Sequence, residues 1–452
     1  MDWQDMDRWL MGEAWVGSQI ATHLQALCDG IGVRWAGTKN ERAAADYVQQ
    51  QLERFGLSNS RVESFTLNTM RSTASSLTVI DEPPWEADIR PSLFCPTIDI
   101  EAPLVDVGFG MHHELEKVQS RLAGSIVLIE TGFEPFSDPV PLTIRLRELV
   151  QRGVVAAITP AVHKGRRLQH MSGADWRDGD ASQVPMPLVQ TSIEDAGRIR
   201  RHAGSELRVR LAVEAVSEQT ESWNAMAELP GDLPGSIILA AHHDTTPDSL
   251  GGNDNGAGVA VMMETARLIQ SLKDQLSQPH CTIQFISFGA EEQGLQGSAA
   301  FVERHCQNEL PTFMLALDEL ATGHMKGVVL QFPELRDFIQ GHLDSMNESL
   351  QCHVLSQLDA SGDMFPFSLR GVPSAFLWRW RFYGKHADTM FGHSSGDTFD
   401  KVRIREMKEY AGLLSRLFVR LASATNWPAN ELDVATIAQR VQQERGGVFR
   451  VM

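Results

Sequence analysis

The sequence predicts an α/β protein built on a mixed, mostly parallel sheet with helices on both faces and a smaller α/β unit inserted into it. From residue 236 onward, continuous apolar runs typical of buried parallel strands alternate with loops and helical patterns. The chain has 452 residues, more than one hydrophobic core usually holds, so we expect two structural units. Apolar residues make up 42% and charged residues 22%, as in an ordinary globular protein.

The N-terminal part contains a clear helical pattern and then changes character. Residues 41–56 carry apolar side chains at helical spacing and stop at Gly56, a typical helix end. From about 75 to 215 the chain has strand signals of its own, at 125–130 and 154–159, with helical stretches between and after them. This order of elements predicts a small α/β domain inserted into the main fold.

The main domain is expected to follow a strand–loop–helix rhythm. Its clearest strands are predicted at 236–241, 282–288, 313–318 and 373–378. The predicted domain limits are 1–74 with 216–425 for the main domain, 75–215 for the insert, and 426–452 for a C-terminal helical tail.

Charge and composition exclude several classes of partner. The net charge of −18 argues against a nucleic-acid partner, which would require clustered Lys and Arg. No run approaches the ~18 apolar residues of a membrane span, and the N-terminus lacks the pattern of a secretory signal. The five cysteines are scattered, so no disulfide framework or zinc knuckle is indicated. We expect a cytoplasmic protein; its oligomeric state stays open.

Residues of the types that bind metals gather in the loops expected at the carboxyl edge of the predicted sheet, where ligands bind in open α/β sheets. They are His242, Asp244, Asp254, Glu291, Glu292, Asp318, His393 and Asp397. Each alone has an ordinary explanation, such as a helix cap or a solvated helix face. Four separate strand ends each supply at least one of these residues, in loops rich in glycine, and this coincidence favours a common site.

The chemistry of this set points to metal ions. Carboxylates and imidazoles without thiolates suit catalytic zinc, with cobalt or manganese as alternatives. An odd number of ligands with one shared carboxylate suits two ions ~3.5–4 Å apart. Asp254, flanked by small residues before a helix, is the candidate to reach both. Glu291 and Glu292 cannot easily point the same way, so one can ligate while the other takes a proton.

Three stretches together resemble the signatures of metallopeptidase family 28, the co-catalytic zinc aminopeptidases and their carboxypeptidase relatives. They are AAHHDTTPDSLGGNDNGAGVAVMMETARLI, FGAEEQGLQGS and HSSGDTFDKV. The segment GTKNERAAADYVQQQLERFGL resembles a helix near the family's N-terminus. The resemblance covers roughly 20–70 and 220–425, and it implies the zinc-exopeptidase fold. It also implies a hydrolase that removes terminal residues from short peptides, most simply an aminopeptidase.

The resemblance also implies a role for each residue. Asp254 would bridge the metals, His242 with Asp318 would complete one site, and Glu292 with His393 the other. Glu291 would be the general base that activates a metal-bridging hydroxide. Asp244 would orient His242 from behind. The Asp254–Asn255 peptide is expected to be cis, as is common in this family.

The insert resembles a protease-associated (PA) domain. The matching stretches are AGSIVLIETG, GVVAAI and VPMPLVQTS; the alternative is a family-specific lid. In either case we expect the insert to narrow access to the site, favouring short peptides over folded proteins.

Substrate choice is left open by the sequence. Glu319 and Asp363 are candidates to bind a free amine, as an aminopeptidase requires. Arg379 and Arg381 are candidates to bind a carboxylate, as in a dipeptidase or carboxypeptidase, although they can also be the outer face of a strand. Tyr383 is a candidate oxyanion donor, with a packing role as the alternative. A non-catalytic binding homologue and a glutaminyl-cyclase-type acyltransferase are further alternatives.

Overall fold

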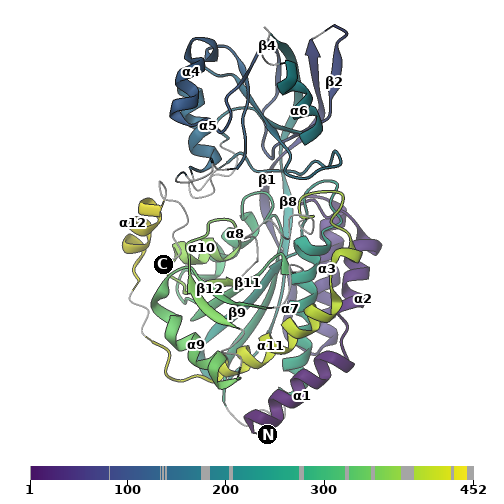
Figure 1. The fold of residues 1–452 in the computed structure, drawn as a ribbon. Coiled ribbons are helices and arrows are strands. Elements are labelled where there is room, and N and C mark those ends of the chain that lie inside the picture. The colour runs from purple at the N-terminus through teal and green to yellow at the C-terminus, as the bar shows by residue number, and fades with distance from the viewer. Residues whose placement is uncertain are drawn as a thin grey trace. The chain divides into compact units, whose positions relative to one another are not determined.

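The computed structural model describes residues 2–80, 82–132, 134, 137, 140–174, 184–202, 207–273, 279–320, 325–347, 352–377, 391–428 and 432–444. The chain forms two compact units. The main unit comprises Met1–Leu67 and Glu221–Glu444, and the inserted unit comprises Asn68–Thr220. The chain passes between them within two long strands, β1 (Ser58–Ile80) and β8 (Arg208–Leu229) (Figure 1).

The central strands of the main unit are parallel. They lie in the order β14 (Ser374–Leu377), β11 (Phe313–Leu317), β9 (Leu233–His242) and β10 (Cys281–Phe288). Beyond β10, β8 pairs antiparallel, and beyond β14 the antiparallel β12 (Gly327–Leu330) is followed by β13 (His353–Ser356), parallel to β12. The predicted mixed, mostly parallel sheet is therefore confirmed.

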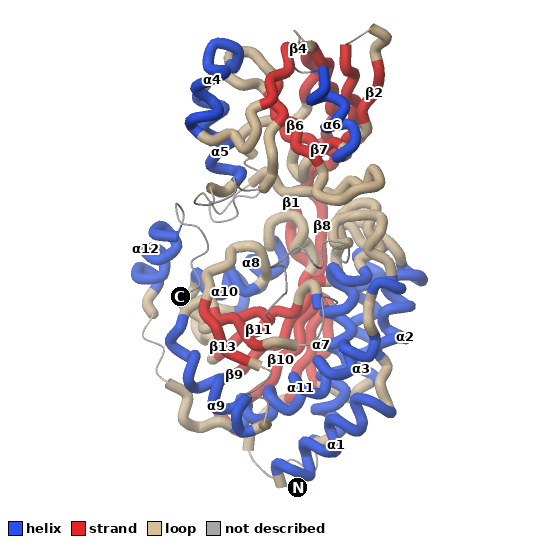
Figure 2. Tube along the Cα trace, viewed as in Figure 1, coloured by secondary structure: helices blue, strands red, loops and turns tan. Residues whose placement is uncertain are grey.

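Helices cover both faces of this sheet (Figure 2). Because side chains alternate along a strand, β9 sends Ile237 and Leu239 to one face and Ile238 and Ala240 to the other. The first pair packs in the same core as α7 (Ala257–Ser271) and α11 (Ile404–Ser423). The second packs with α8 (Gln296–His305) and α10 (Met364–Leu369). Burial on both faces explains why this segment reads as an unbroken apolar run.

The remaining helices of the main unit are α1 (Trp3–Val16), α2 (Ile20–Leu24), α3 (Lys39–Arg54), α9 (Arg336–Ser345) and α12 (Val434–Glu444). The helix expected over 41–56 corresponds to α3, whose N-cap Thr38 accepts a hydrogen bond from the Glu41 amide. Gly56 follows α3 at φ 87°, a left-handed conformation that favours glycine.

The inserted unit has its own small parallel sheet. Its strands lie in the order β4 (Ile98–Asp106), β5 (Ile126–Leu128), β6 (Ala156–Pro160) and β7 (Leu188–Thr191), with β3 (Ile89–Pro91) antiparallel at the edge. The short β2 (Trp85–Ala87) pairs with β1. Its helices are α4 (His112–Leu122), α5 (Leu142–Gln151) and α6 (Ile193–His202).

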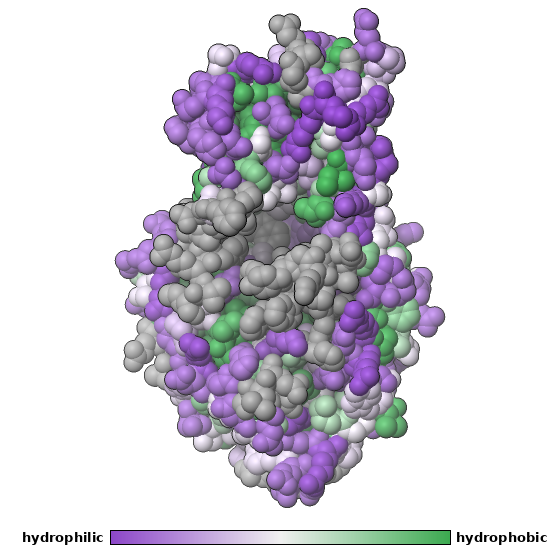
Figure 3. Space-filling model, in the orientation of Figure 1, coloured by the Kyte–Doolittle hydropathy of each residue, from purple (hydrophilic) through white to green (hydrophobic). Residues whose placement is uncertain are grey.

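On the face drawn in Figure 3, hydrophilic residues predominate and apolar ones form small separate groups. None of the described helices combines the length and apolar character that crossing a membrane would require. All five cysteines are free and buried.

Candidate metal centre

Three parallel strands bring their carboxyl ends to one place. His242 is the last residue of β9, and Phe288 of β10 lies beside it in register. Leu317, the last residue of β11, pairs with Ala241 of β9. The loops that follow β10 and β11 therefore start beside His242, and they carry Glu291, Glu292 and Asp318.

Asp254 enters from a tight loop that precedes α7. The loop, Gly252–Gly256, contains the Asp254–Asn255 peptide, which is cis as expected. Asn255 anchors it: its Nδ2 donates to the Leu317 carbonyl at 2.7 Å, and its Oδ1 accepts from the Gly258 amide at 3.0 Å. A Cβ at Gly252 would lie 2.4 Å from the Thr398 carbonyl oxygen, so only glycine fits this approach.

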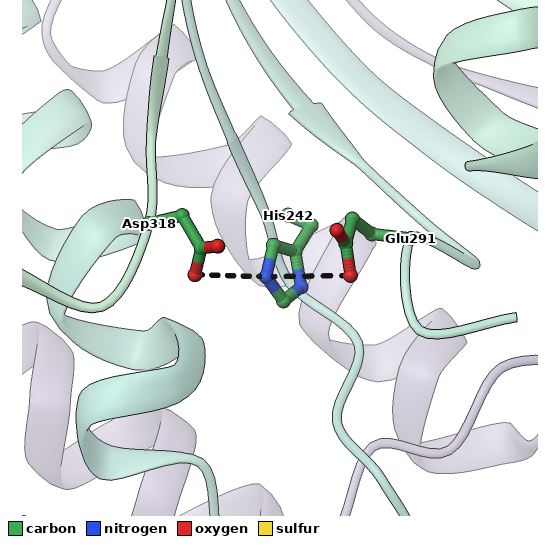
Figure 4. Close-up of side chains that lie close together, drawn as sticks. All are labelled: His242, Glu291 and Asp318. Carbon is green, nitrogen blue, oxygen red and sulfur yellow. Dashed lines mark hydrogen bonds and ion pairs between the residues drawn. The ribbon is translucent and has the colours of Figure 1, made fainter. Parts of the chain in front are cut away.

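One group of potential ligands surrounds His242 (Figure 4). Its Nε2 lies 3.4 Å from Asp318 Oδ1 and 3.8 Å from Glu291 Oε2. All three residues are buried. They come from the ends of three adjacent strands, as the sequence predicted for His242 and Asp318.

A second group consists of Asp254, Glu292 and His393. His393 Nε2 lies 3.0 Å from Glu292 Oε2 and 3.2 Å from Asp254 Oδ2. The other oxygen of Asp254, Oδ1, lies 3.3 Å from His242 Nε2 in the first group. The Asp254 carboxylate therefore faces both groups, one oxygen to each.

Asp244 supports three of these residues from behind. Its Oδ1 lies 3.4 Å from His242 Nδ1, the nitrogen opposite the one that faces the other ligands. Its two carboxylate oxygens also accept the backbone amides of Glu291 at 3.1 Å and Glu292 at 3.2 Å. Asp244 thus fixes one imidazole and the loop that carries two glutamates, a wider role than the sequence suggested.

Asp397, for which the sequence predicts no specific role, supports the backbone of the loop that carries Asp254. It is buried, and its two oxygens accept the backbone amides of Asn253 at 2.7 Å and Asp254 at 2.9 Å. Burial raises the pKa of Asp397 to about 7, and the two amide bonds oppose that rise. Asp397 therefore holds the backbone of the shared carboxylate. A single Asp in a polar loop carries no signal that would identify a partner 143 residues away.

Replacing Asp397 by Asn should weaken metal binding by about 10–100-fold, the usual effect of losing a group that orients a ligand. The amide retains one acceptor oxygen but turns an NH₂ group toward a backbone N–H. The measurement is a competitive zinc titration. Asp359→Asn is the control, because Asp359 Oδ1 accepts hydrogen bonds from the amide of Ser361 at 2.8 Å and from Ser361 Oγ at 2.6 Å. Equal zinc affinities in both variants would contradict the assignment.

The electrostatics of the centre favour a cation. Burial raises the pKa of Glu291 well above its usual range and that of Glu292 to about 7, and the charges of neighbouring carboxylates raise both further. Burial lowers the pKa of His242, but the charge of Glu291 and contacts with Asp244 and Asp254 raise it well above normal overall. Among the described residues, the buried Glu292 Oε1 has no hydrogen-bond partner. Divalent ions would satisfy this oxygen and neutralise the carboxylates.

Two of the predicted substrate-binding residues lie at the centre. Glu319, directly after Asp318, is buried at φ 50°. A Cβ built on Gly392 would lie 3.1 Å from Glu319 Oε1 and 3.2 Å from Asp254 Oδ2, so these carboxylates flank one point. Asp363 is buried at the start of α10, and its Oδ1 has no hydrogen-bond partner in the part of the chain that the structure describes.

The other substrate-site predictions, Arg379, Arg381 and Tyr383, lie outside the described residues. Their predicted contacts with a peptide carboxylate or an oxyanion stay predictions.

Comparison with known proteins gives a consistent result. Residues 224–418 match the sequence profile described as Peptidase family M28. Aminopeptidase YwaD of Bacillus subtilis is 26% identical over 375 residues, covering 78% of this chain and 74% of that protein. Carboxypeptidase Q of Bos taurus is 24% identical over 405 residues, covering 86% and 82%. The solved structure of BSAP, a zinc aminopeptidase from Bacillus subtilis, has a TM-score of 0.68 at 20% identity and covers 92% of this chain and 97% of its own. This likeness confirms the predicted fold.

Proposed function

We propose that this chain, a metallopeptidase of family M28 as its sequence predicted, is a di-zinc aminopeptidase that acts on short peptides. The observation that carries the proposal is the position of Asp254. Its carboxylate presents one oxygen to His242 and the other to His393, so two ligand groups share one residue. The similarity to Aminopeptidase YwaD supports the same reading.

The residues present fit two zinc ions. With Asp254 shared, each ion would have three ligands: His242 and Asp318 at one, Glu292 and His393 at the other. Three nitrogen and oxygen ligands with a remaining open position suit catalytic zinc. The ions would polarise the scissile carbonyl and lower the pKa of a water molecule between them.

Glu291 is left over once each ion has three ligands. Its Oε2 is the most distant of the carboxylate contacts to His242 Nε2, at 3.8 Å against 3.3 Å for Asp254 and 3.4 Å for Asp318. We therefore assign Glu291 as the general base. It would accept a proton from the attacking water and deliver it to the leaving amine.

The buried carboxylates that are not proposed metal ligands favour binding of the amino terminus of a peptide. Glu319 and Asp254 flank the same point at Gly392, and Asp363, near Glu291, has an oxygen without a hydrogen-bond partner among the described residues. A protonated α-amine would pair with such groups, whereas a substrate carboxylate would be repelled by them. The second candidate is a dipeptidase or carboxypeptidase, favoured by the long match to Carboxypeptidase Q and by Arg379 and Arg381.

A panel of dipeptides with free and blocked ends tests this assignment. The enzyme would be assayed with added zinc, cobalt or manganese. We expect acetylation of the amine to abolish cleavage and amidation of the carboxylate to be tolerated. Loss of cleavage only on amidation would replace the proposal by a carboxypeptidase, and loss on either change by a dipeptidase.

We also propose that the inserted unit is a PA-like domain that restricts access to the metal centre. Its support is the order of its elements, a parallel sheet β4–β5–β6–β7 with three helices, together with the matching sequence stretches. A cytoplasmic location stays part of the proposal and rests on the sequence alone.

A further inference from the structure

Arg34 is a buried cation outside the ligand set. It is fully buried, and its guanidinium donates to five backbone carbonyl oxygens. These acceptors are His243 at 2.7 Å, Leu250 at 2.8 Å, Gly32 at 3.0 Å, Leu27 at 3.1 Å and Gly251 at 3.2 Å. A planar group with five N–H donors can serve so many acceptors at once, and a lysine ammonium with three cannot.

Three of these carbonyls belong to the loop that leads from one ligand to the next. His243 directly follows the ligand His242, and Leu250 and Gly251 come just before Asp254. The backbone of Arg34 adds to this attachment. Its amide donates to Thr245 Oγ1 at 3.0 Å, and its carbonyl accepts from the Thr245 amide at 3.3 Å. Arg34 therefore holds both ends of the segment between two proposed ligands.

The packing around Gly251 shows how close this attachment is. Gly251 has φ 59°, and a Cβ there would lie 2.3 Å from Thr245 Cγ2 and 2.6 Å from Arg34 Nη2. The Arg34 guanidinium thus fills the space beside the turn at Gly251. A residue with a Cβ at position 251 would displace the guanidinium.

The charge of Arg34 has no local ion-pair partner. Within the described part of the chain, no carboxylate lies within ion-pair distance of it, although a guanidinium is costly to bury unpaired. Burial lowers the pKa of Arg34, and the charges of Cys28, Asp397, Asp244 and Asp254 oppose this. Three of those four groups belong to the metal centre. The cation and the acidic centre therefore compensate one another.

We propose that Arg34 is a positioning residue for the metal centre: it fixes the loop between His242 and Asp254 and offsets part of the ligands' negative charge. This inference rests on the proposed function, because it assumes that these residues bind metal. It assigns a role in metal affinity and ligand geometry to the N-terminal segment, which lies more than 200 residues from the loop in sequence.

The test compares Arg34→Lys with a matched buried arginine. Arg145 in the inserted unit also donates to three carbonyls, those of Phe109, Glu130 and Thr131, at 2.7–3.0 Å. Both Lys variants keep the charge and lose carbonyl contacts. We expect Arg34→Lys to raise the zinc dissociation constant about 10–100-fold and to alter the visible spectrum of the cobalt-loaded protein. Arg145→Lys should lower thermal stability and leave both metal readouts unchanged.

Kinetics add a second readout. At saturating zinc, Arg34→Lys should lower kcat more than it changes KM, because ligand geometry is altered and peptide contacts are not. Thr245→Val, which removes only the acceptor of the Arg34 amide, should change zinc affinity in the same direction by a smaller factor. If Arg34→Lys does not fold, Thr245→Val tests the inference in its place.

Unchanged zinc affinity and cobalt spectrum in Thr245→Val and in folded Arg34→Lys would overturn the inference. Such a result would leave the proposed function intact provided that the unmodified protein binds two metals. If the unmodified protein binds no metal, the proposed function itself fails, so the two failures can be told apart.

Discussion

Replacing Asp254 by Asn should reduce peptide hydrolysis at least about a thousand-fold and lower the zinc content below two ions per chain. The Asp254 carboxylate faces His242 with one oxygen and His393 with the other. An amide has one oxygen and no charge, so it can serve one ligand group only. Metal ions contribute several kcal/mol to the transition state, and about 1.4 kcal/mol corresponds to a tenfold change in rate.

The substitution is nearly isosteric, so the expected loss is chemical. The backbone amide of Asp254 can still donate to Asp397, and the Asn255 anchor to the Leu317 carbonyl is untouched. Activity would be measured on an unblocked dipeptide, and zinc by elemental mass spectrometry after dialysis. Asp195→Asn, which replaces a buried carboxylate of the inserted unit, is the control and should retain both the activity and the zinc content. A fully active Asp254→Asn enzyme with two zinc ions would disprove the shared-ligand arrangement.

The parts of the fold that could be predicted are those with a strong local pattern. The segments of β9, β10 and β11 are apolar because both of their faces are buried, so they read as strands directly. Parallel pairing then places the residues that follow them together, and this is why His242, Asp318 and the glutamate pair could be proposed as one site.

Elements without such a pattern could be predicted only in part or not at all. The alternation in SRVESFTL predicts a strand over 60–67, but β1 spans 23 residues, and many of its later side chains are exposed, so no apolar pattern marks its full length. β12 and β13 have four residues each, too few for periodicity to be read. The roles of Asp397 and Arg34 depend on hydrogen bonds to backbone atoms far away in the sequence, and such contacts leave no trace in residue spacing.

Replacing Glu291 by Gln should lower kcat about 10²–10⁴-fold while the protein keeps two zinc ions, as expected when a general base is removed. The residue lies within the buried group that contains His242 and Asp318, so its position alone allows a second assignment as a metal ligand. The two roles predict different outcomes. A base can be lost without loss of metal, whereas a lost ligand lowers zinc affinity together with turnover.

The comparison with Glu292 makes this distinction sharp. Glu291 and Glu292 are adjacent, both buried, and both held through their amides by Asp244, so Gln substitutions perturb the backbone equally. Glu292→Gln should lose zinc, because Glu292 Oε2 lies 3.0 Å from His393 Nε2. Glu264→Gln, a buried glutamate paired with Arg267, is the control. If Glu291→Gln also loses zinc, Glu291 is a ligand; if it loses neither zinc nor turnover, the proton is transferred elsewhere.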